Sequence, residues 1–106
     1  MKDESFKDFV LDQLQELDDV EARRMFGGHG LYQDEIFFGI IHKSRLYFKI
    51  DEKRVAEYRK RKMKPFRPNA NQALQTYYEV PVAIIEDGDR LFEWAEAAIR
   101  CRKKTD

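Results

Sequence analysis

Three of the five glycines in the sequence lie within one short stretch, residues 24–32, which reads RMFGGHGLY. A glycine-rich stretch can bind phosphate when its backbone N–H groups converge at the start of a helix. Here no Lys-Ser or Lys-Thr pair follows, and the next residues, LYQDEIFFGII, have the two-residue period of strands. We therefore interpret the stretch as a tight turn or bulge in which a glycine has a positive φ. The alternative is a bare backbone surface that a partner approaches closely.

Other side chains that could do chemistry show no catalytic or metal-binding spacing. The only two histidines, His29 and His42, form no HxH or HxxxH pair. The single cysteine, Cys101, lies among cations that could lower its pKa, but we interpret it as a small residue late in a helix. We therefore expect no catalytic residues, no cofactor and no metal, and we predict that the protein is not an enzyme. An enzyme with unidentified residues remains a further hypothesis.

A basic segment near the middle of the chain is the strongest functional lead. Among its cations Glu57 is the only acid, and the aromatic residues Tyr58 and Phe66 are interleaved with them. Such a patch can contact nucleic-acid phosphates or an acidic protein surface. We favour a solvated helix face and keep weak nucleic-acid binding as the alternative function. The segment comprises Lys53, Arg54, Arg59, Lys60, Arg61, Lys62, Lys64 and Arg67.

Composition narrows the class of protein. With 106 residues, of which 42% are hydrophobic and 13% aromatic, we expect one globular domain over residues 1–106. Lys plus Arg and Asp plus Glu both number 20, so the net charge is zero and gives no general attraction to nucleic acid. The N-terminus lacks a signal-peptide pattern, and no apolar run reaches the roughly 18 residues of a membrane span. We therefore expect a cytoplasmic protein that does not bind membranes.

In the first half of the chain, the spacing of apolar residues changes once, from a helical pattern to a strand pattern. Apolar residues at helical spacing predict an amphipathic helix over residues 5–18, with Ser5 as its N-cap. Residues 22–50 then form short β-type runs separated by turn residues. The connections are too short for parallel crossovers, so this region predicts a meander of about four antiparallel strands.

The second half returns to helix after one more strand. Asp51 is expected to cap a helix that reaches about Lys62 and includes an i,i+4 pair of Glu57 and Arg61. Two prolines favour a loop over residues 64–73. A strand over residues 74–80 follows and ends at a third proline.

Asp89 is expected to cap the last helix, whose apolar positions form one stripe. In the preceding strand, Tyr77 and Tyr78 must point to opposite faces of the sheet, as must Tyr47 and Phe48. One residue of each pair is therefore expected in the core. The other is expected on the opposite face, packed under a helix or loop or forming part of a protein interface.

Several separated motifs give the chain a family resemblance. The segment RRMFGGHGLYQDEIFFGIIHKSRLYFKID is followed by KPF, YYEVP and LFEWAEAAIR. In order and spacing this resembles the N-terminal domain of the TfoX/Sxy family of bacterial competence regulators, over roughly residues 10–100. The residues assigned to the family motif, as a structural turn or an interaction surface, are Arg24, Met25, Phe26, Gly27, Gly28, Gly30, Leu31, Tyr32, Tyr77 and Tyr78.

The resemblance implies an α+β fold. In it a curved antiparallel sheet of about five strands packs against N-terminal, middle and C-terminal helices. It also implies a non-enzymatic role through protein partners, since the better-known members promote transcription of DNA-uptake genes with a cyclic-AMP receptor protein. Those members carry a second, helical domain, whereas we expect a single-domain member here. A transcription factor is the partner class that the resemblance implies, and a symmetric homodimer is a further arrangement considered.

Overall fold

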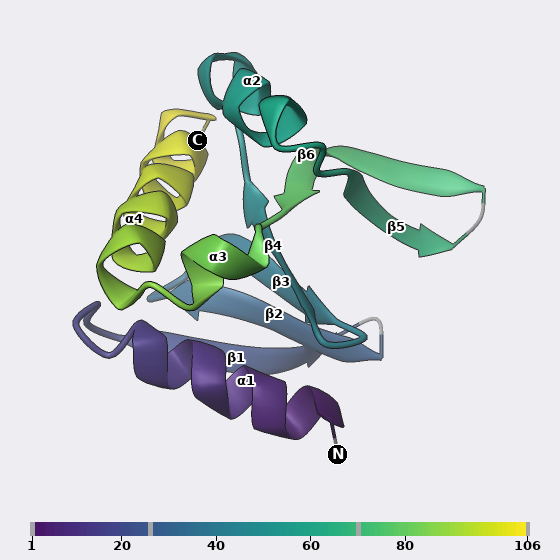
Figure 1. Cartoon of the computed structure of the whole chain (residues 1–106). Helices are drawn as coiled ribbons and strands as arrows, with labels where there is room; N and C mark the ends of the chain where they lie inside the picture. Colours follow the sequence, from purple (N-terminus) through teal and green to yellow (C-terminus); the bar gives the residue numbers. More distant parts are fainter. Residues whose placement is uncertain (1, 26, 70, 106) are drawn as a thin grey trace.

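The computed structural model describes residues 2–25, 27–69 and 71–105, and within them an open sheet of six strands forms the centre of the fold (Figure 1). The strand order is β1-β2-β3-β4-β6-β5, and every neighbouring pair is antiparallel. This confirms the predicted α+β class with one strand more than expected. The strands are β1 (Val20–Met25), β2 (Gly28–Gln33), β3 (Ile36–His42), β4 (Arg45–Lys49), β5 (Pro65–Asn69) and β6 (Gln72–Glu79).

The first four strands form the predicted meander because short turns with left-handed residues join them. Asp34 has φ of 55° between β2 and β3, and Lys43 and Ser44 have φ of 50° and 59° between β3 and β4. Positive φ values suit the tight hairpin turns whose twist matches that of the strands. A register shift between Leu31 and Tyr32 adds a bulge to the β2–β3 pair, and a bulge increases the local twist of a sheet.

The prediction of a loop over residues 64–73 was wrong, because residues 65–69 form β5 and residues 72 and 73 begin β6. Proline lacks the N–H that a central strand needs, but it is tolerated on an edge strand. Pro65 and Pro68 lie on such an edge, and Phe66 between them is completely buried. Burial of Phe66 therefore outweighs the local turn signal, and the hairpin extends away from α1 and α4 (Figure 1).

Four helices complete the fold, and two of their predicted starts were wrong. Helix α1 (Lys2–Gln13) begins before Ser5 and ends before 18, although Leu14 and Leu17 still reach the core through the turn that follows. Helix α4 (Gly88–Thr105) is capped by Asp87, whose Oδ1 accepts a hydrogen bond from the Arg90 N–H at 3.3 Å. The short helix α3 (Val82–Ile85), which the sequence did not predict, directly precedes that cap.

Helix α2 (Glu52–Lys60) follows the prediction more closely. The Asp51 carboxylate accepts a hydrogen bond from the Arg54 N–H at 3.0 Å, as an N-cap should. The helix ends at Lys60, two residues earlier than expected, and Lys62 has φ of 64° in the turn after it. None of the helices in the described residues combines the length and apolarity needed to cross a membrane.

The sheet carries a core on each face. The main cluster unites one face with side chains from all four helices, and it includes Phe48 and Tyr78. The opposite face holds a smaller cluster of Ile40, Tyr47, Phe66 and Tyr77, to which helices contribute nothing among the described residues. Tyr47 and Tyr77 were expected under a helix or loop or in an interface. They are instead buried among other strands, because β5 brings Phe66 to 4.9 Å from Tyr47 between ring centroids.

Candidate functional site

The glycine motif forms the turn between β1 and β2. Met25 pairs with Gly28, and Gly27 between them has φ of 74°, as the turn interpretation requires. A Cβ on Gly28 would collide with the carbonyl oxygen of Ile41, and a Cβ on Gly30 with the sulfur of Met25. The glycines therefore allow backbone reversal and close packing of strands. Phe26 of the motif lies outside the described residues.

The remaining motif residues lie on β1, β2 and β6 and are divided between the two faces of the sheet. Leu31 and Tyr78 belong to the main core, and Tyr77 lies in the smaller cluster. Tyr32 is half-buried, with the Arg23 guanidinium 4.2 Å from its ring centroid. Arg24 is exposed, and its Nη2 lies 3.8 Å from Glu4 Oε1 on α1. The structure thus distributes these residues between turn, cores and surface rather than around one pocket.

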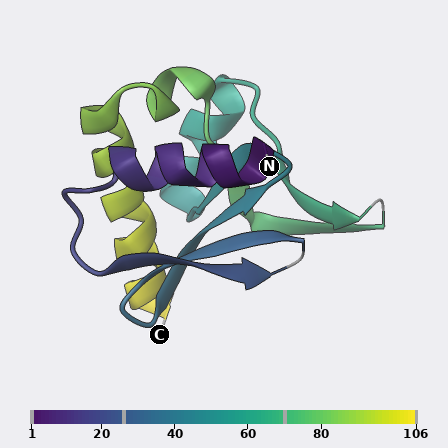
Figure 2. The same cartoon turned by 90° about the horizontal axis from the view of Figure 1, so that it is seen from below.

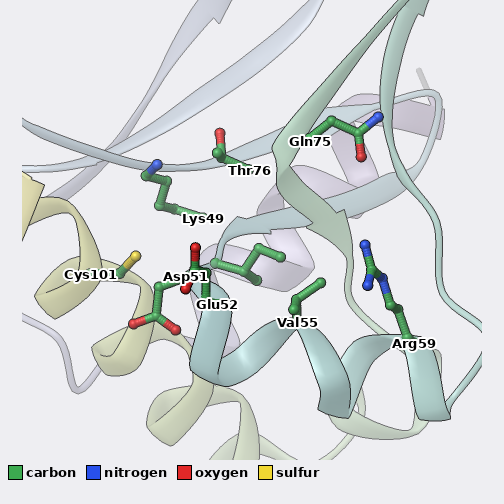
Figure 3. Close-up of a pocket in the computed structure, with 9 residues that line it drawn as sticks. Lys49, Asp51, Glu52, Val55, Arg59, Gln75, Thr76 and Cys101 are labelled. Atoms are coloured by element: carbon green, nitrogen blue, oxygen red, sulfur yellow. The ribbon is translucent and has the colours of Figure 1, made fainter.

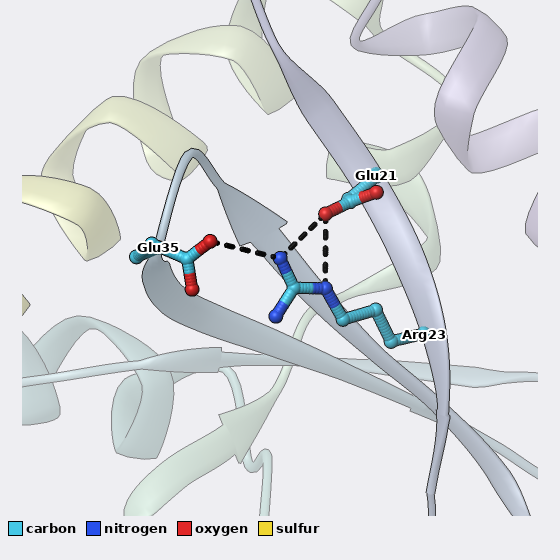
Figure 4. A network of polar contacts seen from close by, with 3 residues as sticks. All are labelled: Glu21, Arg23 and Glu35. Atoms are coloured by element: carbon cyan, nitrogen blue, oxygen red, sulfur yellow. Dashed lines mark hydrogen bonds and ion pairs between the residues drawn. The ribbon is translucent and has the colours of Figure 1, made fainter.

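Three charged side chains form a network on the strand-only face of the β1–β2 hairpin (Figure 4). Glu21 Oε1 accepts hydrogen bonds from Arg23 Nε at 2.9 Å and Nη2 at 2.6 Å. Glu35 Oε1 lies 3.4 Å from the same Nη2. Hydrogen bonding of the Arg23 guanidinium to the Glu21 carboxylate is the main reason that the pKa of Arg23 is raised. The network was not predicted, although the i,i+2 spacing of Glu21 and Arg23 on a strand indicates that they share a face.

The two borders of the sheet differ in their capacity to pair with another strand. At one border, Pro65 and Pro68 of β5 have no N–H to donate. At the other border, β1 contains no proline over its six residues. Figure 2 shows β1 running along this border with α1 to one side of it. We call the outward side of β1 the open edge.

The register identifies the backbone groups on the open edge. Met25 and Gly28 close a two-residue hairpin, and closing pairs of this kind exchange hydrogen bonds. The Asp34 N–H also donates to the Asp19 carbonyl at 3.2 Å, so odd-numbered residues face β2. Val20, Ala22 and Arg24 therefore direct their N–H and C=O groups outward. Within the described chain, neither group of these three makes a backbone hydrogen bond outside the β1–β2 ladder.

The basic segment is placed around α2 and is partly engaged within the chain. Arg59 Nε donates to the Tyr78 hydroxyl at 3.4 Å, and the Arg61 guanidinium lies 5.5 Å from the Trp94 ring centroid. The carboxylate of Glu57 lies 3.7 Å from Arg54 Nη1, so its ion pair is with Arg54 rather than with Arg61 as predicted. Lys53, Lys60, Lys62, Lys64 and Arg67 are exposed.

Acidic residues of α4 surround part of this basic segment. Helices α2 and α4 enclose a pocket of about 450 Å³ lined by Arg54, Glu57, Arg90, Glu93, Trp94, Glu96 and Arg100. Arg67 lies elsewhere, in a pocket of about 330 Å³ with His42, Lys43 and Arg45 beside the β3–β4 turn. The described side chains of this pocket therefore carry both signs of charge and do not form a uniformly basic surface.

A pocket of about 360 Å³ lies between α2, α4 and the strands β4 and β6 (Figure 3). Its charged groups are of both signs, with Cys101 and Arg59 at opposite ends (Figure 3). Asp51 serves as the cap of α2, and Arg59 contacts Tyr78. Sequence reasoning missed this pocket because its walls come from three distant segments. They are Lys49, Ile50, Asp51, Glu52, Val55, Arg59, Gln75, Thr76 and Cys101.

The two histidines do not come together. His29 is 93% buried on the helix-covered side, with Nε2 3.6 Å from Glu4 Oε1 and Nδ1 lacking a hydrogen-bond partner in the described structure. His42 lies on the other face, with its ring centroid 5.4 Å from that of Phe66. Over the described ranges, no three His, Cys, Asp or Glu side chains are grouped in a way that could hold a metal ion.

Comparison with known proteins adds one finding. The family model described as the TfoX N-terminal domain matches residues 12–102, which include all six strands and most of the helical layer. Among curated proteins, none matches this sequence.

Proposed function

Since the chain belongs to the TfoX N-terminal domain family, we propose that it is a cytoplasmic, non-enzymatic interaction module that binds protein along the open edge of β1. A transcription factor is one class of regulatory partner suggested by the resemblance to competence regulators. The family match supports the assignment of the domain type. The proposed mode of binding rests instead on the outward backbone groups of β1 at the border of the sheet.

The difference between the two sheet borders is the observation that carries the proposal. A strand border with unpaired N–H and C=O groups is a template for another strand, and proteins commonly block such borders with proline. This chain has two prolines on β5 and none on β1. An extended segment can therefore add to β1 through main-chain hydrogen bonds, as peptides do when they extend a sheet.

Side chains on β1 supply selectivity for the added segment. Glu21 and Arg23 face the strand-only side with exposed side-chain fractions of 56% and 41%. Opposite charges directly across two strands are favourable and like charges are unfavourable, each by roughly 0.2–1 kcal/mol. A partner strand that places a cation opposite Glu21 and an anion opposite Arg23 is therefore favoured over an arbitrary extended segment.

The test compares two substitutions at the same exposed position. Arg24→Pro removes an outward N–H, whereas Arg24→Ala removes the same charge and keeps that N–H. Tagged wild type and both variants are recovered from their own cells with and without nuclease, and bound proteins are identified by mass spectrometry. We expect a nuclease-resistant partner that Arg24→Ala retains and Arg24→Pro loses, with circular dichroism showing that both variants are folded.

Two results would overturn the proposal. One is retention of the same partners by folded Arg24→Pro, which would place binding away from the open edge. The other is recovery of nucleic acid alone, lost at moderate salt and in a Lys60→Ala, Lys62→Ala, Lys64→Ala variant. That result would support the alternative function of the basic segment, because phosphate contacts weaken steeply with salt.

A further inference from the structure

We propose that the strand added at the open edge of β1 is β1 of a second copy of this chain, in antiparallel orientation and with Ala22 on the two-fold axis. The inference rests on the proposed function, since it names the occupant of the same edge. Two six-stranded sheets would then join into one continuous sheet.

Backbone geometry permits this pairing. Val20, Ala22 and Arg24 direct their N–H and C=O groups away from β2, as the hairpin register requires. An antiparallel pair centred on Ala22 places Ala22 opposite its own copy and Val20 opposite Arg24. All three outward residues of each strand then enter the new ladder. A two-fold axis makes the contact self-complementary and closed, so it produces a dimer rather than a fibre.

Charge selects this register from the other symmetric ones. Centring the axis on residue 21 would oppose Glu21 to its own copy, and centring it on residue 23 would oppose Arg23 to its own copy. An axis at residue 20 places Glu21 against Asp19, and an axis at residue 24 opposes Arg24 to its own copy. Only the axis at Ala22 places Glu21 of each strand opposite Arg23 of the other. Directly opposed charges are a recognised determinant of strand pairing.

The existing network is suited to accept the second copy. Arg23 is held over the Tyr32 ring and bonded to Glu21, so its guanidinium is already positioned on the strand-only face (Figure 4). In the dimer the two Glu21–Arg23 pairs would lie side by side with alternating sign. Glu35 would support each Arg23 from the β2–β3 turn, where it lies 3.4 Å from the guanidinium.

The interface is small, so the dimer should dissociate on dilution. A single strand pair over residues 20–24 involves far fewer residues than the 20–30 per partner of a standard interface of about 1,600 Å². The exposed charges should also make association weaker at high salt. Sedimentation velocity over a wide concentration range at low and high salt is therefore the appropriate measurement.

Charge reversal followed by mixing gives the decisive test. Glu21→Arg makes both positions cationic, and Arg23→Glu makes both anionic, so each variant alone would oppose like charges across the axis. We expect each to dimerise about tenfold more weakly than wild type. An equimolar mixture restores opposite charges at both crossings, so we expect a heterodimer close to wild type in affinity. Glu35→Arg is the control, because it disturbs the same intrachain network without facing the second copy.

The outcomes separate this inference from the proposed function. Heterodimer formation on mixing, with a dimer retained in Glu35→Arg, supports pairing at the stated register. Wild type that stays monomeric at its highest soluble concentration overturns the inference. A dimer whose affinity is the same in both charge-reversal variants as in wild type also overturns it. In either of these cases a partner captured by Arg24→Ala and lost by Arg24→Pro would still support the proposed function. Urea unfolding of each variant shows whether the monomers remain folded.

Discussion

Gly27 and Gly28 are neighbours in the β1–β2 turn, but the structure requires glycine at each for a different reason. Gly27 has φ of 74° with open space where a Cβ would lie, whereas a Cβ on Gly28 would collide with the backbone of Ile41. We expect Gly27→Ala to lower the free energy of unfolding by about 1 kcal/mol through backbone strain. Gly28→Ala should lower it by about 2 kcal/mol or more, because β3 has to move.

Urea unfolding of the two variants and of Gly30→Ala checks this ranking. A Cβ on Gly30 meets the flexible end of Met25, so its replacement should cost less than that of Gly28. Equal losses at Gly27 and Gly28 would contradict the assignment of separate roles.

Tyr58 makes the free energy of unfolding depend on pH in the alkaline range. Burial raises the pKa of its phenol, whose ring packs against those of Trp94 and Tyr78. In the unfolded chain this phenol ionises near its ordinary value of about 10. The contribution of Tyr58 to the free energy of unfolding is therefore complete below about pH 10. It is lost as the pH rises above this value, because the unfolded state then releases a proton that the folded state keeps.

We expect Tyr58→Phe to lose less stability than wild type between neutral pH and about pH 11, relative to each protein's own value at neutral pH. Urea unfolding at a series of pH values measures the difference. Parallel decreases for the two proteins would show that Tyr58 does not cause the alkaline loss.

At the scale of elements, the Asp51 cap determines where α2 begins. Its carboxylate bonds to the Arg54 N–H at 3.0 Å, and caps of this type stabilise by about 1 kcal/mol. We expect Asp51→Ala to lower the free energy of unfolding by that amount, and Asp51→Asn to lower it less because the amide oxygen still accepts. A loss as large in Asn as in Ala, measured by chemical denaturation, would indicate a role for the charge instead of the cap.

Local sequence predicted elements well where turn residues and hydrophobic period agree. Examples are the turns at Asp34 and Lys43–Ser44 and the helix that Asp51 caps. The prediction from local sequence failed at β5, because proline lacks the N–H that a central strand donates. The position of β5 at the border of the sheet makes that missing donor tolerable. The four-residue α3 is too short to show a helical period.

The same reasoning explains what could be predicted of the candidate site. Motif spacing marked the β1–β2 turn, because its glycines are adjacent in sequence. The short connections predicted the meander of the first four strands, but no local pattern placed β6 beside β4 and β5 at the far border. Neither the open edge of β1 nor the border position of β5 could therefore be predicted. The walls of the pocket near Cys101 are likewise brought together from residues 49–59, 75–76 and 101 by the fold alone.

At the scale of the whole molecule, α2 is held by less buried surface than α4. Tyr58 is the one buried side chain on α2, whereas α4 buries Leu91, Trp94, Ala95, Ala98 and Ile99, among others. Segments with few buried contacts open locally at lower free energy than the core. Because α2 forms one wall of the pocket that contains Cys101, such opening would also expose that pocket.

We therefore expect α2 amides to exchange with solvent at least about tenfold faster than those of α4 between Leu91 and Ile99, measured by hydrogen exchange at neutral pH. Asp51→Ala should accelerate exchange in α2 further while leaving α4 near its wild-type rates when global unfolding is corrected for. Equal protection of the two helices would mean that α2 opens only with the whole domain, and that the pocket is as rigid as the core.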